Sequence, residues 1–182
     1  MNKKIVKITG IIFFVCISLI TAWGCKSESA NEKIDELSGY YWEANDGSLL
    51  CLEEDGSFKW YRYSNDRTDS YYSGTYTVYN GMEAVNYIST ELAKYELTYD
   101  EQLEVIENYY DKTIDDYYCL ILDNKEMIVD GKNIIDEVTQ GGSTITPFYG
   151  FYHSESEALK LANMNTANYA NFKRYYEEEE KE

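Results

Sequence analysis

The stretch "GYYWEANDGSLLCLEEDGSFKWYRY", residues 39–63, contains three strand-forming runs separated by two turns that each end in glycine. Tyr, Trp and Phe favour strands, whereas Asn, Asp and Gly favour turns. In the third run, Phe58, Trp60 and Arg62 alternate with Lys59, Tyr61 and Tyr63, as in a strand that buries one face. This pattern predicts an antiparallel sheet. Its first strands are expected at 40–44, 48–53 and 58–63, with turns at 45–47 and 54–56.

The alternation of strand-like runs and turn residues continues to residue 153. Asn80-Gly81 lies between runs at 71–79 and 82–88, and Asn-Gly in that position is the strongest short signal for a β-hairpin. The polar segment 64–70 is expected to be a loop. Further strands are expected at 117–123, 126–130 and 144–153, with turns at 124–125, 130–132 and 141–142.

One helix is expected to interrupt the strands, at 99–110. Thr98 and Glu101 are spaced as in a capping box, in which each side chain accepts a hydrogen bond from the other residue's backbone N–H. Leu103 and Ile106 follow at helical spacing, which supports the assignment.

The segment 154–157 allows two interpretations. Ser154 and Glu157 either cap a second helix or form the turn of a hairpin that places Leu159 and Leu161 on one face of a strand. The hairpin is preferred, because a further strand covers an edge that would otherwise be exposed.

Three short motifs resemble those of small bacterial lipocalin-like domains. They are Gly39-Tyr40-Tyr41-Trp42, Asp55-Gly56-Ser57-Phe58 and Gly74-Thr75-Tyr76, and the resemblance covers residues 37–88. The family has Gly-x-Trp where this chain has Trp42 one position late. The resemblance and the strand pattern together predict a mainly β fold, an antiparallel meander or lipocalin-like barrel with one inserted helix, over residues 37–176. An eight-stranded barrel either holds one small ligand or is filled by its own side chains.

The N-terminal segment has the layout of an export signal. Three lysines precede an apolar run at 8–22 that is shorter than the roughly 20 residues of a membrane-spanning helix. The ending Ala22-Trp23-Gly24-Cys25 resembles a bacterial lipoprotein signal, with Trp23 in place of the usual small residue. The resemblance implies acylation of Cys25 and attachment to the outer face of the cell membrane.

Two alternatives to lipid attachment remain open, namely secretion after ordinary cleavage at Gly24 and an uncleaved membrane anchor. Under the preferred interpretation, residues 1–24 are a signal peptide and residues 25–36 are a polar tether. Residues 177–182 form an acidic tail.

Charge restricts the partners. Residues 25–182 hold 13 basic and all 33 acidic residues, which gives a net charge of −20. Nucleic acid and anionic lipid surfaces are therefore disfavoured. Besides the membrane reached through the lipid anchor, the expected partners are a small molecule, a sugar or a cationic peptide. The protein is expected to be a monomer.

No motif for catalysis or for a cofactor is present, and none is expected. His153 is the sole histidine and is expected to be structural. Calcium is the best metal candidate, in loops at 65–69 and 111–116, but neither loop has EF-hand spacing. Cys51 and Cys119 are expected to be buried free thiols, with a disulfide between them as the alternative.

The preferred function is a non-catalytic binding module that exposes aromatic side chains, because Tyr and Trp combine a rigid apolar ring with a polar group. One alternative is a secreted hydrolase that uses a pair of carboxylates. Another is an immunity or inhibitor lipoprotein that captures a cationic peptide. The ligand-face candidates are Trp42, Trp60, Tyr61, Tyr63 and Tyr76.

Overall fold

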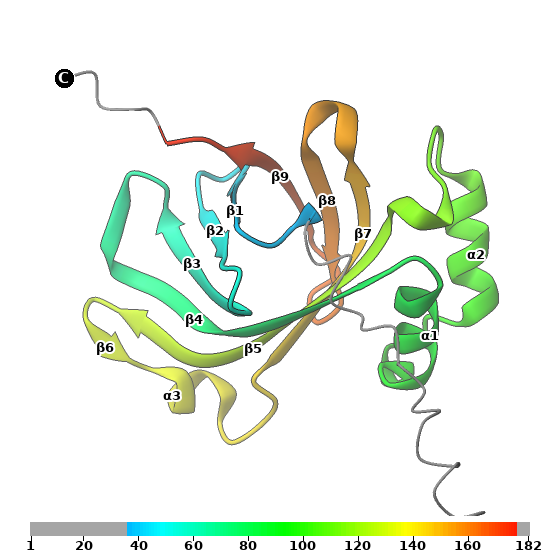
Figure 1. Ribbon diagram of the computed structural model, residues 1–182. Coiled ribbons are helices and arrows are strands. Elements are labelled where there is room, and N and C mark those ends of the chain that lie inside the picture. The colour runs from blue at the N-terminus through cyan, green and yellow to red at the C-terminus, as the bar shows by residue number, and fades with distance from the viewer. Residues whose placement is uncertain (1–35, 178–182) are drawn as a thin grey trace, which may run out of the picture. The chain divides into compact units, whose positions relative to one another are not determined.

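Residues 36–177 are described by a computed structural model (Figure 1). The expected signal peptide, the lipid-attachment candidate Cys25 and residues 178–182 lie outside the described residues.

Eight antiparallel strands close into a barrel. Each strand pairs with the next strand of the barrel along the chain, and the last pairs with the first, so the meander leaves no open edge. The predicted fold class is confirmed. The barrel strands are β1 (Tyr40–Ala44), β2 (Leu49–Leu52), β3 (Ser57–Tyr63), β4 (Asp66–Asn80), β5 (Tyr117–Val129), β7 (Ile145–His153), β8 (Ala158–Asn163) and β9 (Tyr169–Tyr175).

Two insertions interrupt the meander. Helices α1 (Met82–Thr90) and α2 (Tyr99–Asn108) join β4 to β5, and they lie against one side of the barrel (Figure 1). The short strand β6 (Lys132–Asn133) and helix α3 (Ile135–Thr139) join β5 to β7. The sequence predicted one inserted helix, and the structure adds α1 and α3. The described segment also contains the 3-10 turns η3 (Ala93–Tyr95), η4 (Ile114–Asp116) and η5 (Ser154–Ser156).

The hairpin predicted around Asn80-Gly81 is wrong. Residues 82–90 form α1, because Ala84, Val85 and Ile88 have helical spacing and bury against the outer face of β5. The partner of β4 is instead β5, which pairs with it from Tyr71 to Asn80. The signal at Gly81 is genuine at the backbone level, since its φ is 61°, but the turn leads into a helix.

Two other local predictions are also corrected. The expected loop at 64–70 is mostly strand, because β4 begins at Asp66. The expected turn at 124–125 is a bulge in one continuous strand: Ser73 pairs with Glu126 and Gly74 with Asn124, which leaves Lys125 unmatched. Gly74 permits this close approach, since a Cβ there would lie 2.0 Å from the carbonyl oxygen of Asp123.

Two other local predictions are confirmed. The capping box of α2 is present, with Glu101 N donating to Thr98 Oγ1 at 3.3 Å. The segment 154–157 turns a hairpin between β7 and β8, as preferred. Strand β9 had no distinct sequence signal, yet it pairs with both β8 and β1 and thereby closes the barrel.

Alternate residues of β5 face the inside and the outside of the barrel, and other residues pack against both faces of the strand. Tyr118, Leu120 and Leu122 point into the barrel, whereas Cys119 and Ile121 point toward α1 and α2. The interior is therefore packed along much of its length. Its largest fully buried side chains include Trp42, Phe58, Tyr118, Leu120, Leu122 and Phe172.

Candidate functional site

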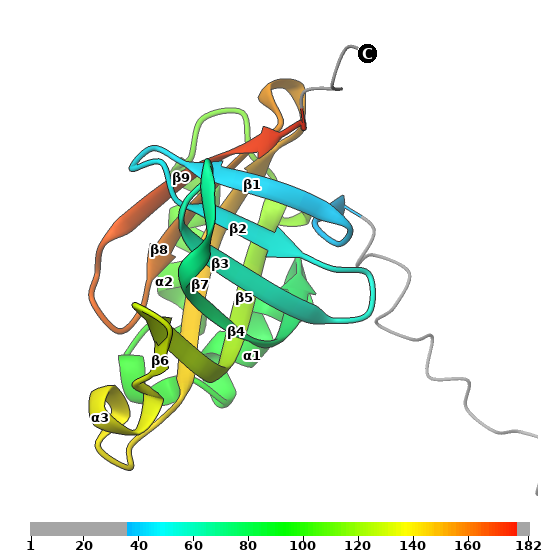
Figure 2. The same cartoon turned by 90° about the vertical axis from the view of Figure 1, so that its left-hand side faces the viewer.

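A cavity of about 700 Å³ opens at one end of the barrel. The β1–β2 and β8–β9 turns meet there with parts of β3 and β4 and with α3. Figure 2 shows α3 and the β8–β9 turn at the same end. We call this cavity the barrel mouth. Its lining includes Ser48, Trp60, Tyr61, Tyr72, Leu122, Asn124, Met127, Val138, Ile145, Thr146 and Asn163.

Strand register explains which side chains meet inside the mouth. Trp60 pairs with Tyr72, and Tyr72 pairs with Met127, so these three side chains share the inner face of three adjacent strands. Leu122 and Thr146 pair in the same way on β5 and β7. The wall that results is mostly aromatic and aliphatic, which is typical of small-molecule sites.

Trp60 is held in one orientation. Its Nε1 donates to Ser48 Oγ at 3.0 Å, and Ser48 Oγ donates to Asp46 Oδ1 at 2.7 Å. The indole also packs against Phe148 and Phe172, with ring centroids 5.8 Å away in each case. A ring fixed from both sides provides a preorganised surface at the base of the mouth.

The mouth also holds polar and charged side chains, among them Asp46, Arg62, Asn124, Thr144 and Thr146. Asn124 Nδ2 donates to Thr144 O at 2.6 Å and to Thr146 Oγ1 at 3.1 Å, which joins β5 to β7 at the rim. Such groups give orientation to a ligand held mainly by apolar contacts.

The opposite end of the barrel is closed. Leu37 lies in the interior with 1% of its surface exposed, and Trp42 Nε1 donates to Leu37 O at 3.3 Å. The Arg174 guanidinium lies 3.6 Å from the ring centroid of Tyr40 and 5.3 Å from that of Trp42. It also forms an ion pair with Glu157 at 2.7 Å. A ligand therefore has access from the mouth end.

The five predicted ligand-face residues separate into three groups. Trp60 and Tyr61 line the barrel mouth. Trp42 and Tyr76 are buried, and Tyr76 OH donates to Glu53 O at 2.7 Å, so both serve the core. Tyr63 is 47% exposed and does not line the barrel mouth.

Sequence reasoning missed much of the mouth. Tyr72, Met127, Leu122 and Thr146 reach it only because β4, β5 and β7 pair in their observed register. The apolar run at 117–122 has no alternation that would show which side chains face inward, and the expected turn at 124–125 hid the continuity of the strand.

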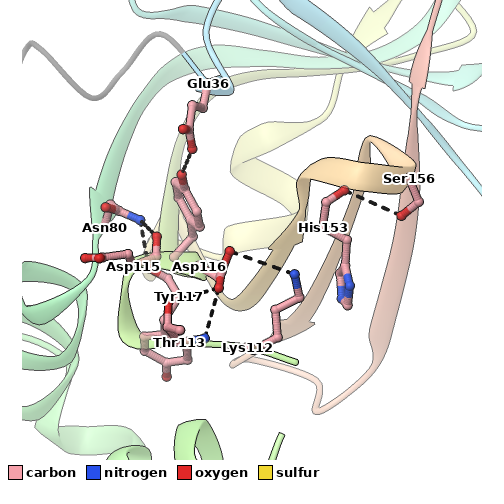
Figure 3. A network of polar contacts seen from close by, with 10 residues as sticks. Glu36, Asn80, Lys112, Thr113, Asp115, Asp116, Tyr117, His153 and Ser156 are labelled. Atoms are coloured by element: carbon pink, nitrogen blue, oxygen red, sulfur yellow. Dashed lines mark hydrogen bonds and ion pairs between the residues drawn. The ribbon is translucent and has the colours of Figure 1, made fainter. Parts of the chain in front are cut away.

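His153 does not form a catalytic pair with Ser156. Ser156 Oγ donates to the backbone carbonyl of His153 at 3.5 Å, not to the imidazole. Figure 3 shows the imidazole beside Lys112, whose Nζ lies 3.8 Å from Asp116 Oδ1. Burial lowers the pKa of His153, and the charges of Lys112 and Lys160 lower it further against the opposing effect of Asp116.

The carboxyl groups with clearly shifted pKa values all move downward. Asp55 accepts hydrogen bonds from Ser57, Glu101 from Thr98, and Asp123 from Lys125, and each interaction lowers the pKa by stabilising the carboxylate. The hydrolase alternative requires a desolvated carboxylic acid with a raised pKa, so these groups do not support it.

Within residues 36–177, no cluster of three or more His, Cys, Asp or Glu is placed to hold a metal ion. In the two loops proposed for calcium, Asp66 Oδ1 accepts a hydrogen bond from Thr68 Oγ1 and Asp116 accepts one from Thr113. Cys51 and Cys119 are buried free thiols, as expected, and burial raises the pKa of each to about 12.

Among the helices of the described segment, none has the length and apolar character needed to span a membrane. Comparisons of the chain with protein-family models, with curated proteins and with solved structures find no match.

Proposed function

We propose that this protein is a lipid-anchored, extracytoplasmic binding protein that takes one small, largely apolar molecule into the barrel mouth. The observation that carries the proposal is the cavity of about 700 Å³ walled by Trp60, Tyr72, Leu122 and Met127. Its volume falls in the range of small-molecule sites, about 300–1,000 Å³. The role is binding without catalysis.

Titration with N-phenyl-1-naphthylamine, a neutral dye that fluoresces in apolar sites, tests the binding site. The protein sample spans residues 33–182, which include all of the described residues. Thr146→Arg places a bulky cation in the mouth and is expected to weaken dye binding at least about tenfold, or roughly 1.4 kcal/mol. Thr75→Arg is the matched control, because Thr75 is an exposed threonine of the barrel, on β4, that does not line the mouth.

Equal affinity of the two variants, or no dye binding by the parent protein, would refute the site. Circular dichroism checks that both variants fold. If Thr146→Arg does not fold, Met127→Glu replaces it, because Met127 lies nearer the rim and is already half-exposed.

The lipid anchor has its own test. In a bacterial host that acylates lipoproteins, Cys25→Ser is expected to lose the mass of the diacylglycerol group and to leave the membrane fraction. Stable anchoring takes two acyl chains, and the diacylglycerol group carries both of them. Loss of this group is therefore sufficient for release. Intact-mass measurement of both fractions is the readout, and Cys16→Ser is the control. A variant mass that differs from the parent mass only by the exchange of the Cys25 sulfur for oxygen would exclude acylation there.

A further inference from the structure

A second cavity, of about 560 Å³, lies on the outside of the barrel. Its floor is formed by Tyr149, Ala162 and Tyr169, which pair in register across β7, β8 and β9. Their chain neighbours Phe148 and Leu161 belong to the interior core, so the floor residues face outward. Helix α2 and the segment after η3 form the facing wall. We call this cavity the outer groove.

The outer groove has aromatic surface that the fold leaves accessible. Tyr169 is 77% exposed, and Tyr149 is half-buried at its side. Tyr95 OH donates to Asn165 Oδ1, and Asn165 Nδ2 donates to Ile145 O at 3.1 Å. These bonds tie the segment at η3 to the barrel, so one end of the groove is held in place.

The facing wall is acidic. Glu101, Glu104 and Asn108 lie on one face of α2 at spacings of three and four residues, and Glu96 precedes the helix. Among the described residues that line the groove, none is basic. Nor does an ion pair within residues 36–177 neutralise Glu96 or Glu104.

Charge decides between possible occupants. Anionic partners are repelled by this wall, and a second copy of the chain carries a net charge of −17. A cationic side chain would be stabilised by both surfaces of the groove, because the carboxylates of the facing wall attract it and the tyrosine rings of the floor bind it by cation–π contact. The chain already uses such contacts, as with Arg174 over Tyr40 and with Lys94, which lies 4.8 Å from the ring centroid of Tyr95.

We propose that the outer groove binds a basic peptide segment, with a lysine or arginine side chain held between the Tyr149–Tyr169 surface and the carboxylates of Glu96 and Glu104. This site is separate from the barrel mouth and does not depend on the function proposed there. Binding of this kind matches the capture of a cationic peptide at the cell surface.

The test uses an acetylated and amidated tri-arginine peptide and the full chain in a non-ionic detergent. The isosteric tri-citrulline peptide lacks the charge and serves as the ligand control. The double variant Glu96→Gln/Glu104→Gln is compared with Glu91→Gln/Glu107→Gln, which removes the same net charge from exposed positions outside the groove. Isothermal titration calorimetry measures the dissociation constant.

The groove variant is expected to bind tri-arginine roughly three- to tenfold more weakly than the parent, and the control pair within about twofold of it. Tyr169→Ala is expected to weaken binding by a similar factor, whereas Tyr110→Ala, at a position 85% exposed outside the groove, leaves it unchanged. Thr146→Arg blocks the barrel mouth and should not alter peptide binding, which separates the two sites.

Three outcomes would overturn the proposal. Equal weakening in both Glu→Gln pairs would show a general attraction to acidic surface. Equal binding of tri-citrulline would show a neutral ligand, such as a sugar or an uncharged peptide. The third is absence of tri-arginine binding at millimolar peptide.

Discussion

At the residue scale, Arg174 connects several segments of the chain at the closed end of the barrel. Its guanidinium packs over Tyr40 and near Trp42, and it forms hydrogen bonds with Glu157 and with the backbone carbonyl of Glu36. Strand β9 thereby contacts β1, the β7–β8 turn and the segment that precedes β1. No sequence motif marked this arginine, because its partners come from three separate parts of the chain.

Arg174→Ala is expected to lower the free energy of unfolding by about 2–3 kcal/mol, since it removes an ion pair, two cation–π contacts and their packing. Urea denaturation measures the change. Arg62→Ala is the matched control: Arg62 also lies over a tyrosine ring, that of Tyr63, but both residues are exposed, so the expected loss is below about 0.5 kcal/mol. Similar losses in both variants would contradict the role of Arg174.

At the scale of secondary-structure elements, helix signals in this chain were more specific than turn signals. The capping box at Thr98 and Glu101 combines two side chains with a helical apolar stripe, and it predicted α2 well. Asn80-Gly81 specifies only a backbone turn. Whether a strand or a helix follows is decided by burial of Ala84, Val85 and Ile88 on β5, a strand that begins only at Tyr117.

The capping box makes a quantitative prediction. Thr98→Ala removes the acceptor for Glu101 N and is expected to cost about 1 kcal/mol of the free energy of unfolding. Thr98→Ser keeps the hydroxyl and should remain within about 0.5 kcal/mol of the parent. Chemical denaturation followed by circular dichroism provides the comparison. If alanine and serine are equally tolerated, the cap does not stabilise α2.

At the scale of the whole molecule, several groups make folding sensitive to acid. The pKa values of Asp55, Glu101 and Asp123 are lower in the folded chain than in model peptides, so the unfolded state binds more protons at low pH. Their stabilisation is complete above about pH 4.5 and is lost as the pH falls toward their folded values. The lowered pKa of His153 has the same sign, and its loss starts near pH 6.5.

The urea midpoint is therefore expected to fall slightly from pH 7 to 5.5 and steeply below pH 4.5. High ionic strength is used, because it screens the long-range repulsion among carboxylates that protonation would otherwise relieve. In His153→Gln the first decrease should disappear while the second persists. A midpoint that rises on acidification under these conditions would contradict the prediction.

The sequence by itself determined the mainly β character, the first three strands and their turns, and the helix at α2. These depend on local physics: strand propensity, positive φ at glycine, and a cap made by neighbouring residues. It also supplied Trp60 and Tyr61 of the barrel mouth, as aromatic residues of a strand that the local pattern predicted.

Only the tertiary structure decided the rest. The barrel closes through β9, which pairs with β1 across more than 100 residues of chain, and no local pattern encodes that register. The same closure buries Trp42 and Tyr76, and it brings Tyr72, Leu122 and Met127 together in the barrel mouth. The outer groove likewise requires α2 to face β7–β9. Aromatic residues that look alike in the sequence thus become core, mouth or groove according to the side of the barrel that strand pairing assigns to them.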